Sequence, residues 1–217
     1  MQATSPDPLP RGRHGLKPAE VAAHQRGRIA DGIARAVAEH GYGSLTVERV
    51  IELAGVSRST FYAHFDNKLE AVLASHELIF ERFMVEIVDS CGRDEWPAKI
   101  RDAVGATLTF ASTAPAQFQM LSVGSLAVDV ELAGRILDSF QRLAGLLAGV
   151  RAVSPYRTQL PSCTEQFLVG GLAATVSSWL SYGQQPDLSE LQRQLVELTL
   201  IPYYGRAKAA RLSRVDG

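Results

Sequence analysis

The sequence has little cysteine and no metal-binding pattern, and both shortages exclude a class of protein. Its 217 residues include two cysteines, Cys91 and Cys163, which have neither C-x-x-C spacing nor a histidine at metal-ligand spacing. A disulfide framework and a zinc site are therefore excluded, and we expect no cofactor. So few and so widely separated cysteines indicate a reduced, cytoplasmic compartment.

The sequence also lacks the apolar segments of a secreted or membrane protein. No apolar run resembling a signal peptide follows the first residue. The charge-free run 103–128 is long enough to span a bilayer, but Pro115 interrupts it and its hydroxyl and amide groups are too polar for lipid. With 46% hydrophobic and 21% charged residues, the composition is that of a globular protein with a substantial core. We expect no membrane partner.

A strong excess of either charge is absent too. The formal net charge of −1 gives no overall argument for nucleic acid, so any affinity for DNA depends on where the charges lie. Residues 1–16 combine prolines and glycines with Arg11, Arg13 and His14, which indicates a flexible basic arm. Such an arm can lie along phosphates or enter a minor groove, and it can equally be a solvated tail.

The most informative stretch, residues 46–68, predicts two short helices joined by a tight turn. Apolar residues recur three and four positions apart through 47–54, which is one face of a helix. Thr46 stands before that face as an N-cap. Gly55 follows it, at the point where a sharp turn requires positive φ. A third helix, from Pro18 to His40, precedes the pair and completes a helix-turn-helix domain over 17–68.

The second helix of the pair has the composition of a DNA-reading helix. We expect Ser57 to cap it and Phe61 and Phe65 to face inward, which leaves arginine, hydroxyl, tyrosine and histidine groups outside. Arginine pairs with guanine, hydroxyls reach base edges or phosphates, and the other polar groups suit phosphate oxygens. The predicted partner is double-stranded operator DNA, and the predicted contacts are Thr46, Ser57, Arg58, Ser59, Thr60, Tyr62, His64 and Lys68.

These residues resemble the DNA-binding domain of the TetR family of bacterial transcriptional regulators (TetR/AcrR-like). The resemblance rests on Thr46-Val47, Ala54-Gly55-Val56-Ser57, Thr60-Phe61-Tyr62, His64-Phe65 and Asn67-Lys68, and it is specific from Arg26 to Leu73. Beyond these residues it holds in length and helical pattern alone. It implies a homodimer formed through the last two long helices, a small-molecule effector and, most often, repression.

Two other interpretations compete at this stretch. The run Gly55-Val56-Ser57-Arg58-Ser59 is close to a G-x-S-x-G nucleophile elbow, but that motif needs a preceding strand and a glycine in place of Ser59. The second is a plain three-helix core that binds no DNA.

Downstream, residues 69–217 are predicted to form a ligand-binding and dimerisation domain. Residues 67–70 have the layout of a capping box that opens one long helix, which ends near Cys91-Gly92. His76 on its apolar face is expected to be a packed core histidine rather than a ligand. A further helix pair carries the charge-free run 103–128, which forms either a solid core or the wall of an apolar pocket.

The predicted pocket follows from this run. Because the run offers no counter-charge, we expect a neutral or weakly polar effector, aromatic or lipid-like. The predicted ligand-binding residues are Phe110, Phe118, Met120, Leu121, Phe140 and Trp179.

The last helices are predicted to form the dimer. Residues 129–153 are expected to be one helix, followed by a loop to Ser162. The next helix, 166–186, has a small-residue surface, and the one after Pro186 has a leucine repeat of the coiled-coil type. Two such helices from each chain would form a four-helix interface. Its predicted residues are Phe167, Gly170, Gly171, Ala174, Leu191, Leu195 and Leu198, and the basic tail after Gly205 is expected to fray.

The sequence therefore predicts an all-α protein with a basic arm (1–16), a three-helix DNA-binding domain (17–68) and a helical ligand-binding and dimerisation domain (69–217). The predicted function is a ligand-responsive regulator, a repressor that binds a pseudo-palindromic operator as a homodimer and that a small, largely apolar effector releases. An enzyme is not expected, since no nucleophile–base pair stands out. A helical enzyme and a ligand-blind structural DNA-binding protein remain the alternatives.

Overall fold

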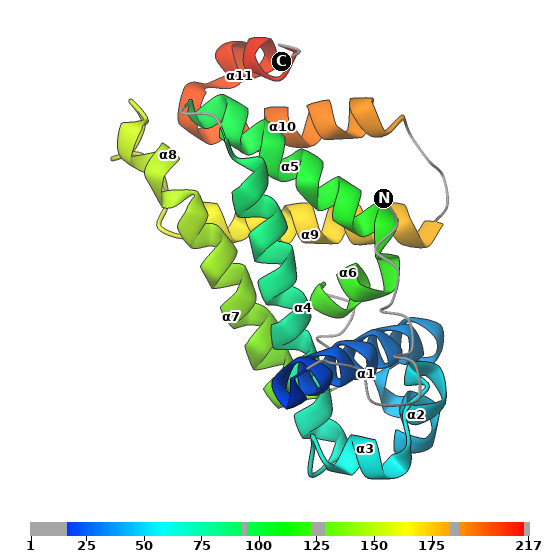
Figure 1. Ribbon diagram of the computed structural model, residues 1–217. Coiled ribbons are helices and arrows are strands. Elements are labelled where there is room, and N and C mark those ends of the chain that lie inside the picture. Colours follow the sequence, from blue (N-terminus) through cyan, green and yellow to red (C-terminus); the bar gives the residue numbers. More distant parts are fainter. Residues whose placement is uncertain (1–16, 93–94, 123–128, 183–186, 215–217) are drawn as a thin grey trace. The chain divides into compact units, whose positions relative to one another are not determined.

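The computed structural model describes residues 17–92, 95–122, 129–182 and 187–214, and these residues form helices joined by short turns (Figure 1). No strand occurs within these ranges, which confirms the all-α prediction. The elements are α1 (Pro18–His40), the 3₁₀ turn η1 (Tyr42–Ser44), α2 (Val47–Ala54), α3 (Arg58–Tyr62), α4 (Lys68–Ser90), α5 (Trp96–Thr113), α6 (Pro115–Leu121), α7 (Val130–Leu146), α8 (Ala148–Val153), α9 (Thr164–Tyr182), α10 (Leu188–Tyr204) and α11 (Arg206–Leu212).

The chain divides into two compact units. The first comprises residues 1–82 and 113–135, and the second comprises 83–112 and 136–217. The division falls within α4 and α7 and before Thr113, the last residue of α5. The functional border that the sequence predicts at residue 68 separates the DNA-reading elements from the rest and stays a prediction.

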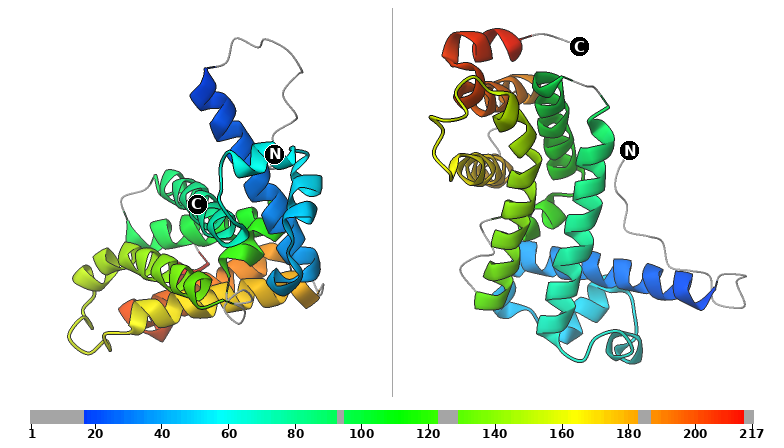
Figure 2. Two further views of the ribbon diagram at one scale, coloured as in Figure 1. Left: turned by 90° about the horizontal axis from the view of Figure 1, so that it is seen from below. Right: turned by 90° about the vertical axis from the view of Figure 1, so that its left-hand side faces the viewer.

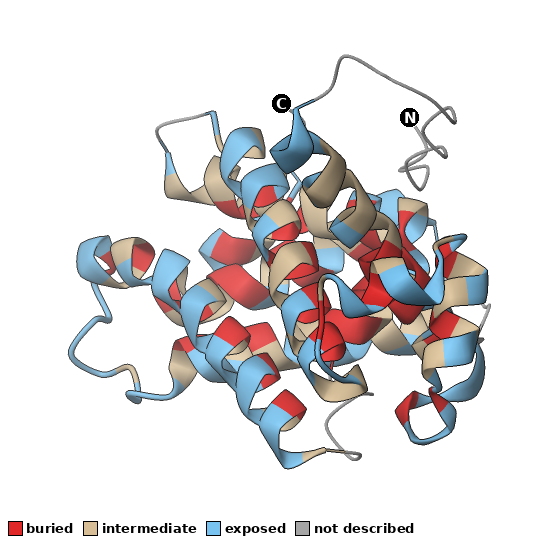
Figure 3. Cartoon of the chain, turned by 60° about the horizontal axis from the view of Figure 1, so that its bottom comes forward, coloured by how far each residue is buried: buried red, intermediate tan, exposed pale blue. Residues whose placement is uncertain are grey.

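In the first unit, α1 is the helix against which the neighbouring elements pack. Pro18 opens it, and Gly41 closes it with φ 74°. Ile29 and Ile33 are completely buried, and α1 packs against both α2 and α6. Figure 2 shows α1 beside α2 in two further views. Burial of its apolar side fixes α2 beside it. Figure 3 shows buried and exposed residues alternating along the helices.

The long helix α4 has the predicted extent, and its start is capped as the sequence indicates. Asn67 Oδ1 accepts the backbone N–H of Glu70 at 2.9 Å, while the Glu70 carboxylate accepts the N–H of Asp66 at 2.7 Å. His76 has no exposed surface and its ring stacks on Phe80, so its assignment to the core is confirmed. Burial, and then the charge of Arg135, lower the pKa of His76 to about 4, which keeps the ring neutral.

Two predicted helices are shorter than expected. The predicted recognition helix, α3, ends at Tyr62, and Phe65, although buried, lies beyond it, in the segment leading to the Asn67 cap of α4. The helix predicted over 129–153 is interrupted at Leu147, whose N–H turns to the carbonyl of Ala144 at 3.0 Å. At the end of α3 the N–H of His64 makes a tighter i→i−3 bond, to the carbonyl of Phe61 at 3.0 Å, which the N–H of Phe65 also shares.

The expectation that the tail frays is wrong for residues 206–212, which form α11. Gly205 supplies a turn with φ 72°, and Ala209 is completely buried. Arg101 Nη2 on α5 donates to the carbonyl of Leu212 at 2.7 Å, which ties the end of α11 to the second unit. The burial of Ala209 and the hydrogen bond to the carbonyl of Leu212 therefore stabilise a segment that, from its basic composition, was expected to be solvated.

No helix among the described residues is both long enough and apolar enough to cross a membrane.

Candidate nucleic-acid interface

The turn between α2 and α3 has the geometry that the sequence predicts. Thr46 Oγ1 accepts the N–H of Arg49 at 3.2 Å, which caps α2. Gly55 adopts the left-handed conformation, with φ 59°, and the N–H of Val56 returns to the carbonyl of Ile51 at 3.1 Å. A side chain at residue 55 would be strained, so glycine allows α3 to follow α2 at a sharp angle.

The same turn is fastened to α1 by an arginine. Arg28 Nη2 donates to the carbonyl of Gly55 at 2.9 Å across 27 residues of sequence. A β-carbon on Gly55 would lie 2.5 Å from that guanidinium nitrogen, so the absent side chain also makes room for the bond. Arg28 thereby fixes the turn that orients α3.

Hydroxyl groups gather at the start of α3. Ser57 Oγ accepts the N–H of Thr60 at 3.0 Å and lies 2.8 Å from the hydroxyl oxygens of both Ser59 and Thr60. Ser57 and Ser59 are exposed, so these hydroxyls face solvent at the positive end of a helix, where phosphate oxygens bind well. The predicted contacts Ser57, Ser59 and Thr60 thus form one cluster.

Arg58 lies beside that cluster and pairs with Glu48, an exposed acid in the first turn of α2. Its Nη1 donates to Glu48 Oε1 on α2 at 2.5 Å, and its guanidinium carbon lies 5.5 Å from the centre of the Tyr62 ring. The pKa of the Glu48 carboxyl is lowered by its own backbone N–H and then by Arg58, while Glu48 raises the pKa of Arg58. Tyr62 also packs edge-on against the buried Phe61.

His64 lies in the turn after α3 and is half-buried. Its Nε2 lies 2.8 Å from Gln25 Oε1 on α1, which is a hydrogen bond if that nitrogen carries the proton. Burial, and then the nearby Arg26, lower the pKa of His64, so a neutral donor at neutral pH is the form that the site favours. A neutral His64 can bond a phosphate oxygen only if it releases Gln25.

Lys68 is partly occupied as well. Its Nζ donates to the carbonyl of Leu45 at 3.0 Å and lies 5.2 Å from the centre of the Tyr42 ring. An ammonium group has three protons. The Lys68 ammonium can therefore bond the carbonyl of Leu45, just before α2, and still bind a phosphate. Lys68 is half-buried, as a positioned lysine at a docking surface would be.

Lys68→Ala is expected to weaken binding to specific and random DNA alike, because a phosphate contact carries no sequence information. The slope of log K against log salt should flatten by about one unit. The measurement is fluorescence anisotropy with both duplexes across a salt series. Lys208→Ala is the matched control, since Lys208 lies over the Tyr204 ring at 5.0 Å on α11, and its slope should equal that of the wild type. An unchanged slope in Lys68→Ala would remove Lys68 from the interface.

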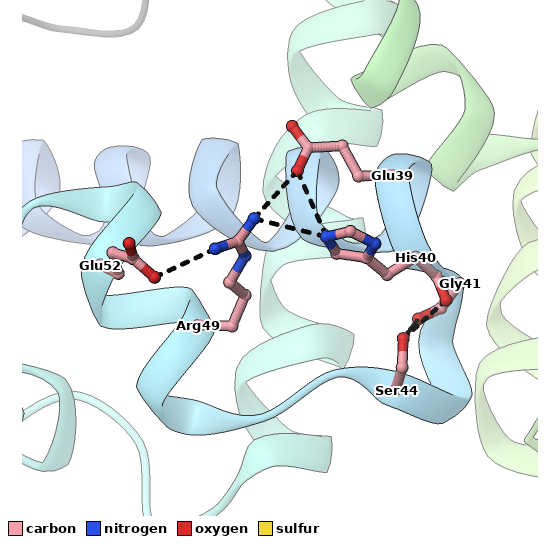
Figure 4. A network of polar contacts seen from close by, with 6 residues as sticks. All are labelled: Glu39, His40, Gly41, Ser44, Arg49 and Glu52. Carbon is pink, nitrogen blue, oxygen red and sulfur yellow. Dashed lines mark hydrogen bonds and ion pairs between the residues drawn. The ribbon is translucent and has the colours of Figure 1, made fainter.

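A second polar network, which the sequence does not reveal, joins the end of α1 to α2 (Figure 4). Arg49 donates to Glu52 at 3.1 Å and to Glu39 at 3.5 Å, and its Nη2 lies 3.3 Å from His40 Nε2. Ser44 Oγ donates to the carbonyl of His40 at 2.6 Å. These acids neutralise Arg49 on the free surface, so Arg49 is a structural link rather than an available cation.

The predicted pocket residues divide between the two units. Phe118, Met120 and Leu121 lie in the first unit and are buried, all on α6. In the second unit, the buried Phe110 lies with its ring centre 5.0 Å from that of Phe83. The remaining part of the charge-free run, 123–128, lies outside the described residues.

The other two predicted pocket residues, Phe140 and Trp179, are half-buried in the second unit. The buried Trp179 Nε1 has no hydrogen-bond partner among the described residues. Within the first unit, a surface hollow between α4 and α7 is lined by Glu77, Glu131 and Arg135, and by none of the predicted pocket residues.

The predicted dimer residues need one correction. Leu191 and Leu195 on α10 are buried within their own chain, so they stabilise the second unit and offer no surface to a partner. The leucine repeat has the same spacing for an internal seam as for an intermolecular one, which is why the sequence did not separate them. The predicted residues that stay exposed are Phe167, Gly171, Ala174 and Leu198, while Gly170 is half-buried.

Among the described residues, no group of three or more histidine, cysteine, aspartate and glutamate side chains is arranged to hold a metal ion. The predicted basic arm, 1–16, lies outside the described residues.

Comparison with known proteins agrees with this geometry. A family model described as bacterial regulatory proteins, tetR family, matches residues 29–74, which span the second half of α1 through the first turns of α4. The fatty acid metabolism regulator protein of Bacillus subtilis (strain 168) is 24% identical over 186 residues, covering 79% of this chain and 91% of that protein.

Two solved structures share the fold. The fatty acid degradation regulator FadR from Bacillus halodurans superposes with a TM-score of 0.69 at 22% identity, covering 81% of this chain and 94% of that one. FadR from Bacillus subtilis in complex with stearoyl-CoA superposes with a TM-score of 0.63 at 20% identity, covering 81% and 97%.

Proposed function

We propose that this chain is a transcriptional regulator of the tetR family of bacterial regulatory proteins, and that it represses transcription as a homodimer on a pseudo-palindromic operator. It acts in the cytoplasm and catalyses no reaction. One observation carries this proposal. The hydroxyl cluster, Arg58 and Tyr62 share the exposed outer side of α3, while Phe61 anchors that short helix in the core.

We assign base reading to Arg58, the first residue of α3 after the Ser57 cap. Its guanidinium is exposed and can donate two hydrogen bonds to guanine. Arg58→Ala is expected to weaken binding to the operator by about 1–3 kcal/mol and to relax preference at one base position in each half-site. The measurement is anisotropy with a duplex that the wild-type protein selects from a random pool, beside single-base variants of it. Equal losses on selected and random DNA would make Arg58 a phosphate contact.

The proposed effector is a lipid-like compound that binds the second unit, with its apolar part against the charge-free residues 103–112 of α5. That run has no arginine or lysine to pair with a buried anionic group, and Phe110 within it is buried. The unpartnered indole N–H of Trp179 provides a donor for a single polar group, such as a carbonyl. The relatives named as fatty acid regulators, one of them solved with stearoyl-CoA, support an acyl chain as that apolar part.

A thermal-shift panel tests the effector. We expect stearoyl-CoA or palmitic acid to raise the melting temperature and to release the selected duplex, because a ligand that binds the DNA-free state lowers DNA affinity by linkage. Succinate is the matched anionic compound without an acyl chain, and it should do neither. Stabilisation and release by succinate alone would contradict a lipid-like effector, while leaving the DNA-binding function in place.

A further inference from the structure

The contact between Glu48 and Arg58 joins the two helices of the DNA-reading pair at the surface predicted to meet DNA. Glu48 lies in the first turn of α2 and Arg58 in the first turn of α3, and their side chains are 64% and 60% exposed. An acid on such a surface repels phosphates, so it weakens the electrostatic attraction that all DNA sequences share. Its cost to binding therefore needs a compensating gain.

Stability of the free protein is not that gain. Ion pairs between two exposed side chains contribute little to folding, because water and salt screen them and ordering two long side chains costs entropy. Glu48 does favour the positive end of α2, but any exposed acid in that turn would do so, including one that points away from α3.

The geometry around Arg58 indicates a different gain. The Glu48 carboxylate takes Nη1, and the Tyr62 ring lies under the guanidinium carbon at 5.5 Å. An arginine presents its Nε and Nη2 hydrogens as a separate edge, and that edge can bond the two acceptors of guanine together. A carboxylate on one side and a ring on one face restrict the rotamers of Arg58 before DNA arrives.

We propose that Glu48 is a positioning residue that orients Arg58 for base reading and so determines how strongly the protein prefers its operator over other DNA. The inference rests on the proposed DNA-binding function and adds a residue to it. Because the side chain of Arg58 is already restricted in the free protein, binding to the operator costs it little further rotational entropy. On other DNA, Arg58 finds no matching acceptors, so its restricted orientation gives no gain there. The repulsion between the carboxylate and the backbone weakens binding to every duplex alike, so the discrimination comes from the orientation of Arg58.

The measured quantity is the discrimination ratio, defined as the Kd for a scrambled duplex divided by the Kd for the selected duplex at one salt concentration. Glu48→Gln keeps the shape of the side chain and removes its charge. We expect it to lower the ratio about two- to tenfold, the range for ordering one long side chain. Its melting temperature should equal that of the wild type, since both partners are exposed.

Glu52→Gln is the matched control. Glu52 is an exposed acid on the same helix, it pairs with Arg49 at 3.1 Å, and removing it changes the net charge equally. This variant should change both Kd values by one factor and leave the ratio unchanged. A fall in the ratio as large as that of Glu48→Gln would overturn the proposal, because the effect would then belong to charge alone.

A double-mutant cycle with Arg58→Ala separates positioning from direct contact. If Glu48 acts through Arg58, adding Glu48→Gln to Arg58→Ala lowers the ratio no further. A further fall of the same size would show that Glu48 reads a base itself, as a carboxylate can at a cytosine amino group, and would overturn the proposal. A wild-type protein without preference for any duplex would overturn the proposed function as well, whereas a wild-type preference that Glu48→Gln leaves intact contradicts only the role of Glu48.

Discussion

Replacing Ala174 by glutamate is expected to dissociate the dimer and to abolish operator binding in the same variant. Ala174 lies on the exposed side of α9, on the same side of the helix as Gly171 and Phe167, and Phe167 is 77% exposed in the single chain. On α10, Leu198 is 59% exposed. Large apolar side chains at this degree of exposure, next to positions without side-chain bulk, suit a surface that a second chain covers.

The size of the effect follows from burying a carboxylate without a partner. An uncompensated buried charge costs about 3–5 kcal/mol, and a twofold interface contains the substitution twice. Each carboxylate therefore weakens dimerisation by roughly a hundred- to several-thousandfold. Because a single recognition helix reads only one half-site, the loss of the dimer removes operator binding with it.

Analytical ultracentrifugation and anisotropy on the same preparation measure both consequences. Ala152→Glu is the matched control, since Ala152 is exposed on α8 and the substitution adds the same charge outside α9 and α10. That variant should stay dimeric and bind the operator. An Ala174→Glu protein that sediments as a dimer would place the interface on another surface.

The parts of the fold that the sequence predicted depend on neighbours three to five residues apart. The Thr46 cap, the left-handed Gly55 and the Ser57 cap each use a hydrogen bond within one helical turn. Such local signals are readable in a sequence because the interacting residues sit at fixed spacing. This is why the helix pair and the start of α4 were located to within a residue or two.

The contacts that escaped prediction join residues far apart in the chain. Asp31 on α1 is buried, and Gln117 Nε2 on α6 donates to it at 2.7 Å across 86 residues, with Arg82 Nη1 at 3.6 Å. A single acid in a helix resembles any solvent-facing acid, so nothing near Asp31 in sequence announces its partners. The bonds of Arg28 to Gly55 and of Arg58 to Glu48 escaped for the same reason.

The sequence predicted well which large apolar residues are buried, but less well whether their own chain or a partner chain covers them. Phe61, Phe110 and Met120 are core residues, as their types suggest. Leu191 and Leu195 also belong to the core, although their spacing fits an intermolecular seam equally well. Hydrophobic period gives the side of a helix that is covered, but only the folded chain shows what covers it.

Replacing Gly32 by alanine is expected to disrupt the DNA-reading elements through a single methyl group. Gly32 is buried on α1, and a β-carbon there would lie 2.9 Å from the backbone nitrogen of Ala54 and 3.0 Å from its β-carbon. Backbone cannot move aside as a flexible side chain can, so the end of α2 must shift away from α1. Overpacking of this kind costs about 1–3 kcal/mol.

The shift matters for function because Ala54 immediately precedes the Gly55 turn that orients α3. We expect Gly32→Ala to melt about 2–12 °C below the wild type, at roughly 2–4 °C for each kcal/mol in a chain of this length. Operator affinity, measured well below the melting transition, should fall as well, since a displaced α3 no longer presents Arg58 in register.

The matched control is the same substitution at a helical glycine with open surroundings. Gly134 on α7 is exposed, and a β-carbon there would meet nothing within 4 Å. Alanine loses less conformational freedom than glycine when a helix forms, so Gly134→Ala should stabilise the protein by about 0.5–1 kcal/mol and leave operator binding unchanged. If glycine-to-alanine destabilises the protein at residue 32 and stabilises it at residue 134, contact with Ala54, rather than helix propensity, decides the outcome at Gly32. If Gly32→Ala melts with or above the wild type, the close approach of α1 and α2 does not constrain the DNA-reading pair.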